Sequence, residues 1–107
     1  MILAEQIYLV TRKFPKDEAF GMTSQMRRSA ASIPANIAEG FGRQQRRSFI
    51  QYLRISQGSL KELETHSELA RRVGLIESNI ANDIANQCET LGKMLRSFIV
   101  KLGAKGK

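Results

Sequence analysis

The sequence predicts an all-α protein, an up-and-down four-helix bundle with a short first helix and a proline-kinked second helix. Three observations lead to this prediction. Apolar residues recur at helical spacing along four segments, the connections between the segments are short, and only two prolines interrupt the 107 residues. A chain of this length can bury a single core, so residues 1–107 are expected to form one domain.

The first helix is expected to end ahead of Pro15. Because the residue before a proline avoids the α region, Phe14 closes this segment. The helix is therefore short, and its apolar positions are Leu3, Ile7, Val10 and Phe14.

The second helix is expected to run from about Met22 to Phe41 along one apolar stripe. Pro34 lies inside it and removes one amide donor. The apolar stripe continues in phase on both sides of this proline, which predicts a kink near Ala30 or Ala31 without a break.

The third helix is expected to be a long rod over residues 45–73, because no proline interrupts this segment. It ends at Gly74, a residue type suited to the position after a helix. The fourth helix follows a short turn and repeats the apolar pattern as far as Leu102. Residues 103–107 are expected to form a frayed basic tail. The apolar face of the third helix consists of Phe49, Leu53, Leu60, Leu63 and Ala70.

Composition and apolar patterning exclude a membrane-spanning chain, because the longest apolar runs are a few residues and a spanning helix needs about 20. The first residues contain no basic segment followed by a signal-peptide core, so export is not expected. Cys88 is the single cysteine, which fits a reducing compartment. We therefore expect a soluble, cytoplasmic protein.

Positive charge is concentrated in one part of the sequence. The net charge is +7, and residues 27–54 contain six basic residues against one acid, Glu39. On a helical projection one column on the third helix is formed by Arg43, Arg47, Arg54 and Lys61. Such a column could bind phosphates, with each cation releasing counterions. The alternative is a solvated helix face. The candidate nucleic-acid contacts are Arg43, Arg46, Arg47, Arg54 and Lys61.

Aromatic side chains are scarce beside this column, because Phe49 and Tyr52 are expected to point toward the core. Base stacking is therefore poorly supported, and recognition of the nucleic-acid backbone or shape is favoured.

Two further strips indicate either packing within the chain or an interface between copies. Small residues lie beside the apolar stripe of the second helix, and the apolar arc of the third helix is wider than one buried face requires. The residues assigned to a candidate oligomer interface are Arg28, Ala31, Ala35, Ala38, Tyr52, Ile55 and His66.

No set of residues predicts an enzyme, a metal site or a cofactor. His66 is the only histidine, whereas a dimetal bundle needs two Glu-x-x-His pairs. We expect His66 to be packed and hydrogen-bonded. Cys88 lies on the apolar arc of the fourth helix, where it acts as a small hydrophobic residue. Gly40 and Gly42 end a helix and follow no strand, so they do not predict a phosphate loop.

Residues 14–43, which read FPKDEAFGMTSQMRRSAASIPANIAEGFGR, resemble a signature of the bacterial 23S rRNA intervening-sequence proteins, and the resemblance continues through residues 48–65 and 74–76. It implies four-helix bundles assembled as homopentamers. The family is similar to the accessory protein of diversity-generating retroelements, which engages nucleic acid and a reverse transcriptase. Relatives usually carry an aromatic-rich turn before the equivalent of Ala4, so the first helix looks shorter here.

Together these features predict a non-enzymatic homo-oligomer that binds RNA or DNA through its basic face. The alternative function is a protein-protein adaptor whose basic face meets an acidic protein partner and which has no nucleic-acid role.

Overall fold

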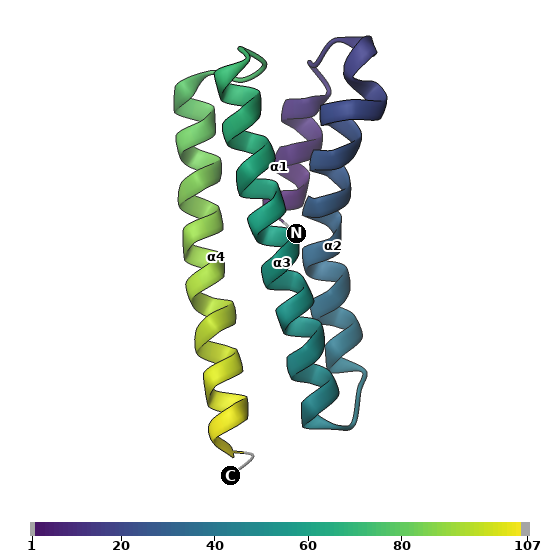
Figure 1. Ribbon diagram of the computed structural model, residues 1–107, viewed down its shortest axis with the longest axis vertical. Helices are drawn as coiled ribbons and strands as arrows, with labels where there is room; N and C mark the ends of the chain where they lie inside the picture. The colour runs from purple at the N-terminus through teal and green to yellow at the C-terminus, as the bar shows by residue number, and fades with distance from the viewer. Residues whose placement is uncertain (1, 106–107) are drawn as a thin grey trace.

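Four antiparallel α-helices make up most of residues 2–105 (Figure 1). The structure is a computed structural model that describes the backbone of residues 2–105 and the side chains of residues 2–18 and 21–103. The helices run alternately up and down, so the predicted four-helix bundle is confirmed. The bundle measures 49 × 23 × 18 Å. The helices are α1 (Ile2–Thr11), α2 (Ser24–Phe41), α3 (Arg46–Arg72) and α4 (Ser78–Lys105).

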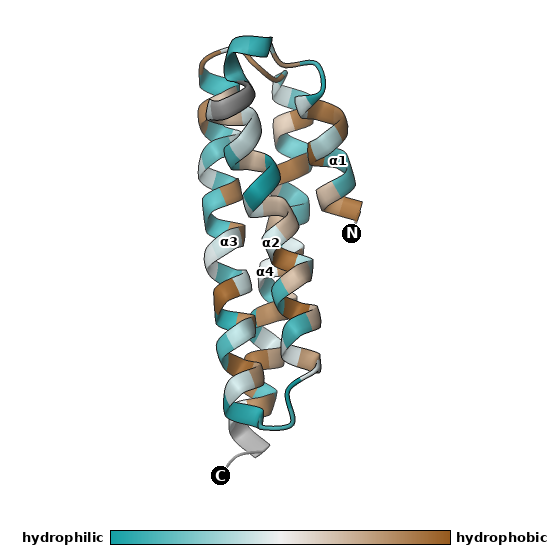
Figure 2. Cartoon of the chain, turned by 90° about the vertical axis from the view of Figure 1, so that its right-hand side faces the viewer, coloured by the Kyte–Doolittle hydropathy of each residue, from teal (hydrophilic) through white to brown (hydrophobic). Residues whose placement is uncertain are grey.

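Helix α1 is short and covers only the upper part of the bundle (Figure 2). It ends at Thr11, whose hydroxyl donates a hydrogen bond back to the carbonyl of Ile7 at 2.7 Å. The Arg27 guanidinium donates to the same hydroxyl at 2.8 Å and ties this end to α2. Helix α1 therefore ends three residues before Phe14. The Phe14 side chain lies beyond the helix and is buried.

A 3₁₀ turn (Lys16–Glu18) and a π-helical turn (Ala19–Thr23) connect α1 to α2. The backbone of Gly21 is non-helical there, so the second α-helix begins at Ser24 and not near Met22. From Ser24 it continues across Pro34 to Phe41 without a break, as predicted.

Helices α2 and α3 approach closely at Gly40. A Cβ atom at this position would lie 2.8 Å from Phe49 Cδ1 and 3.1 Å from Tyr52 Cβ. A methyl group would have to displace both side chains of α3, so the close approach requires glycine.

Short polar side chains link α2 and α3 above this contact. The hydroxyls of Ser32 and Ser59 form a hydrogen bond of 2.8 Å, and the Ser56 hydroxyl donates to the carbonyl of Ile33 at 3.1 Å. The Asn36 amide donates to the Ser32 carbonyl at 2.8 Å. The polar residues of the second helix thus form hydrogen bonds within the chain.

Every helix contributes to one core, in which burying a large aliphatic side chain stabilises by roughly 1.5–3 kcal/mol. Cys88 is 1% exposed and packs as the predicted small hydrophobic residue. Phe41, the last residue of α2, is in contrast 63% exposed. The largest fully buried apolar side chains are Ile7, Met26, Leu53, Leu60, Leu63 and Ile84.

The turn between α3 and α4 is closed by backbone hydrogen bonds around Gly74. This residue has a φ of 84°, which favours glycine. The Leu75 N–H donates to the Ala70 carbonyl at 2.8 Å, and the Gly74 N–H donates to the Arg71 carbonyl at 3.1 Å. These bonds satisfy the last carbonyls of α3 in the pattern of a Schellman motif, as the glycine predicted.

Helix α4 extends to Lys105, so the predicted frayed tail is wrong for residues 103–105. Leu102 packs against the core and holds the last turn in place. Residues 106–107 lie outside the described residues. None of the helices in residues 2–105 has the length and apolar character needed to cross a bilayer.

Candidate nucleic-acid interface

Four exposed cations occupy the first half of α3, and we call them the α3 basic surface: Arg46, Arg47, Arg54 and Lys61. Residues 40–61 contain no aspartate or glutamate. Positive charge on this surface therefore has no acidic neighbour along the preceding chain.

The start of α3 concentrates this charge further. Arg46 and Arg47 lie in its first turn, which contains no acid, and Gln45 provides no side-chain cap. The N-terminus of a helix carries about half a positive charge from its aligned peptide dipoles, so basic side chains there are electrostatically unfavourable. A bound anion would relieve this repulsion.

Arg43 does not belong to the column in which the sequence placed it. It lies in the loop before α3, so the helical projection that aligned it with Arg47 does not apply. Its guanidinium donates to the Glu39 carboxylate at 3.0 Å and to the Tyr52 hydroxyl at 2.8 Å. Arg43 is thus engaged within the chain, through an ion pair with Glu39 of α2 and a hydrogen bond to Tyr52 of α3.

Lys61 and Arg54 remain accessible. The Lys61 ammonium lies 3.5 Å from a Glu64 carboxylate oxygen, but its side chain is 81% exposed. Such a surface pair contributes about 0–1 kcal/mol, so a phosphate can compete for the lysine. Arg54 forms no ion pair within residues 2–18 and 21–103.

The C-terminal end of α3 is different, because both of its arginines, Arg71 and Arg72, form ion pairs with Glu68. Glu68 accepts hydrogen bonds from Arg71 at 2.7 Å and from Arg72 at 2.9 Å. These bonds lower the pKa of the Glu68 carboxyl to about 2. Unpaired positive charge on α3 is therefore confined to its first half.

Aromatic rings near the basic surface are occupied. Phe49 packs against Phe41 and Phe98, with ring centroids 4.8 and 5.3 Å away. Tyr52 is partly buried and holds the Arg43 guanidinium over its ring. Phe49 thus packs toward the core, as expected, whereas Tyr52 directs its hydroxyl to the exposed Arg43.

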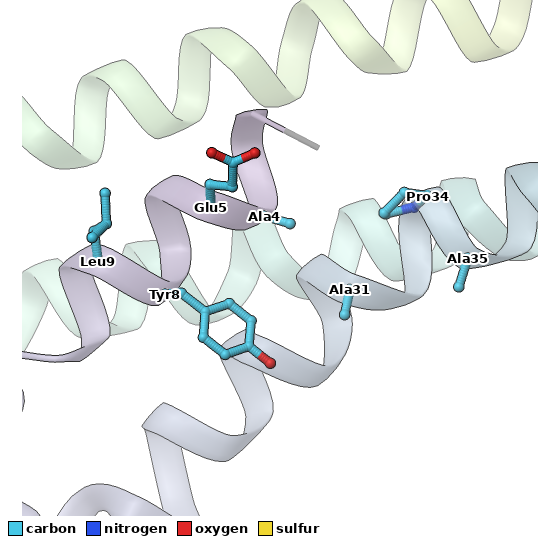
Figure 3. A pocket seen from close by; sticks show the side chains of 7 residues that line it. All are labelled: Ala4, Glu5, Tyr8, Leu9, Ala31, Pro34 and Ala35. Carbon is cyan, nitrogen blue, oxygen red and sulfur yellow. The ribbon is translucent and has the colours of Figure 1, made fainter.

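A second feature is an apolar groove between α1 and α2, with a volume of about 630 Å³ (Figure 3). Tyr8 reaches from α1 toward the face of α2 that carries Ala31 and Ala35. Ala31, Ala35, Ala38 and Arg28 are exposed, so the alternative of packing within the chain is wrong for this strip. The groove is lined by Ala4, Glu5, Tyr8, Leu9, Ala31, Pro34 and Ala35.

The wide arc of α3 is also uncovered. Ile55, Leu69 and Val73 are 44%, 47% and 61% exposed. His66 is partly buried and, within the described side chains, forms no hydrogen bond, so that part of the expectation is wrong. Tyr52 was assigned to the same interface. Its hydroxyl instead accepts a hydrogen bond from Arg43, and its Cβ lies at the close approach of α3 to Gly40.

The sequence and the fold of the chain are similar to those of known proteins. A family model described as 23S rRNA-intervening sequence protein matches residues 1–97. The chain belongs to this family. No curated protein matches the chain at a significant level. A crystal structure of an S23 ribosomal protein family member of unknown function, from Bacteroides thetaiotaomicron VPI-5482, is 32% identical and covers 91% of each chain, with a TM-score of 0.81.

The single thiol of this intervening-sequence protein, that of Cys88, has low chemical reactivity. Burial raises the pKa of Cys88 to about 12, because the thiolate is poorly solvated in the core. The thiol is therefore protonated at neutral pH. Within the described residues, no group of three or more His, Cys, Asp or Glu side chains is arranged to hold a metal ion.

Proposed function

We propose that this protein is a non-enzymatic, homo-oligomeric scaffold of the cytoplasm that binds the backbone of RNA or DNA through the α3 basic surface. The observation that supports this function is the set of four exposed cations within sixteen residues of one helix, in a stretch that contains no acid before Lys61. Each cation that neutralises a phosphate releases condensed counterions.

The proposal predicts a measurable salt dependence. Four phosphate contacts at about −0.9 each give a slope of log K against log[salt] of about −3.6 per chain on a duplex. Arg47→Glu combined with Arg54→Glu should reduce the magnitude of this slope by about two and weaken binding to all duplex sequences nearly equally. Binding to a labelled random-sequence duplex, followed by fluorescence anisotropy at several salt concentrations, measures both quantities.

The matched control is Arg12→Glu combined with Lys13→Glu, which makes the same charge change at exposed residues just after α1. It should leave most of the affinity intact. Equal affinity of the parent and the Arg47/Arg54 variant at low salt would place the binding site elsewhere. If the parent does not bind nucleic acid, the adaptor function with an acidic protein partner replaces this proposal.

For the assembly we propose that the exposed arc of α3 packs into the α1/α2 groove of the next copy. Exposed Ile55, Leu69 and Val73 would fill a groove lined by Ala31 and Ala35. Two different surfaces meet in such a contact, so it is heterologous, and its repetition gives a ring when the rotation between copies closes. We propose five copies because the family resemblance implies pentamers.

Ala35→Glu tests this assembly. A carboxylate forced into an apolar contact without a partner costs several kcal/mol, so the variant should dissociate. Light scattering measures the mass, and Ala85→Glu on α4 is the control at another exposed alanine. A parent mass of one 12.0 kDa chain would refute the assembly.

A further inference from the structure

A groove of about 610 Å³ lies between α3 and α4. Its volume falls within the roughly 300–1,000 Å³ range of ligand sites in proteins. Gly58 on α3 and both Ala85 and Gly92 on α4 are the small residues of its lining. Leu60 and Cys88 also line it, and both are buried.

The two glycines are not required by the packing of the chain itself. A Cβ atom at Gly58 would have no neighbour within 4 Å, and one at Gly92 would lie in ordinary contact with Leu60 Cδ2 at 3.4 Å. Neither residue has a positive φ, since Gly74 alone does so within residues 2–105. Each glycine inside a helix costs roughly 1 kcal/mol relative to alanine. They therefore reduce stability while keeping the groove open.

Cations line both sides of the groove, together with two acids, Glu64 and Glu89. Arg54 and Lys61 come from α3, and Lys93 and Arg96 come from α4. Lys61 and Lys93 form exposed ion pairs with acids of their own helices, at 3.5 and 3.2 Å. Arg54 and Arg96 form none within the side chains that the structure describes. The two arginines, one from each helix, are thus available to an anion in the groove.

The lining also limits how a ligand is recognised. It contains no aromatic side chain on which a base can stack. Arginine binds phosphate oxygens through two parallel N–H groups, which suits a backbone contact. Because Arg54 and Arg96 come from opposite sides of the groove, one sugar-phosphate backbone lying along it can meet both.

We propose that the α3/α4 groove binds one single strand of nucleic acid by its sugar-phosphate backbone, with the bases directed outward. This inference rests on the proposed function and extends it to a second helix. Lys93 and Arg96 then contact phosphates from the α4 side, as Arg54 and Lys61 do from the α3 side. The glycines allow the strand to lie close to both helices.

Lys93→Gln combined with Arg96→Gln tests the α4 side, using fluorescence anisotropy of a labelled oligothymidylate. Each phosphate contact on a single strand contributes about −0.7 to the salt slope, so losing two contacts should weaken binding about 25-fold near 0.1 M salt. The control, Arg12→Gln with Lys13→Gln, should keep nearly the parent affinity. A strand of the same length with abasic sugars should bind as tightly as oligothymidylate.

Gly58→Met gives a second test that does not change charge. Its side chain enters open space, so helicity and thermal midpoint should not fall, while binding of the strand should weaken. The inference is overturned if the Lys93/Arg96 variant binds like its control, if the abasic strand binds poorly, or if poly-glutamate competes equally well. If it is overturned while the Arg47/Arg54 variant still loses duplex binding, the proposed function stands without the groove.

Discussion

Alanine substitutions at Gly40 and Gly58 should change stability in opposite directions. In a helix interior alanine is favoured over glycine by roughly 1 kcal/mol. At Gly58 the added methyl group meets nothing within 4 Å, so Gly58→Ala should retain this gain. At Gly40 the methyl group would lie 2.8 Å from the Phe49 ring, and overpacking costs about 1–3 kcal/mol.

The expected difference in unfolding free energy between the two variants is therefore about 2 kcal/mol, with Gly58→Ala the more stable. Urea unfolding followed by far-ultraviolet circular dichroism measures it, at one chain concentration because self-association would shift the midpoint. In thermal unfolding each kcal/mol corresponds to about 4–8 °C for a domain of this size.

A double-mutant cycle with Phe49→Ala isolates the cause. Removing the ring makes room for the methyl group, so Gly40→Ala should be less costly in that background. If Gly40→Ala is as stable as Gly58→Ala, or if Phe49→Ala does not alter its cost, the close approach of α2 and α3 is not what requires glycine at this position.

Three further predictions concern the core and titrating groups. Leu63→Ala should lower the unfolding free energy by about 2–5 kcal/mol in urea titrations, because Leu63 is fully buried. Cys88 should resist iodoacetamide in the native protein at pH 8 and react on unfolding, because burial raises its pKa to about 12. The folded-state pKa of Glu68, about 2, lies below the ordinary 4.5, so its contribution is present above pH 4.5 and is lost as pH falls toward 2. Glu68→Gln should make acid unfolding curves flatter in this range, and unchanged curves would contradict the role of Arg71 and Arg72.

Local patterns in the sequence were sufficient to predict the helices and the turn at Gly74. Periodic apolar residues report which side of a helix is buried, and Gly74 has the positive φ that its position required. Arg43 was misplaced because a projection assumes a helix wherever the spacing fits, whereas the loop before α3 turns its guanidinium toward Glu39 and Tyr52.

The groove between α3 and α4 was beyond sequence-based prediction for a different reason. Gly58 and Gly92 are far apart in the chain, and only the packing of the two helices brings them to one groove. Lys93 and Arg96 lie in the fourth helix, and no pattern in the sequence pairs them with Arg54. Their position opposite Arg54 depends on the rotation of α4 about its axis, which periodicity defines too coarsely.

The hydroxyl contacts between α2 and α3 prevent the two helices from sliding along each other. A shift of one helical turn, about 5.4 Å, would separate Ser32 from Ser59 and the Ser56 hydroxyl from the Ile33 carbonyl. Each intramolecular hydrogen bond contributes about 0.5–1.5 kcal/mol net, so such a shift is unfavourable. The hydrogen bonds therefore favour one register of α2 against α3, and a tilt of α4 would widen the α3/α4 groove without breaking them.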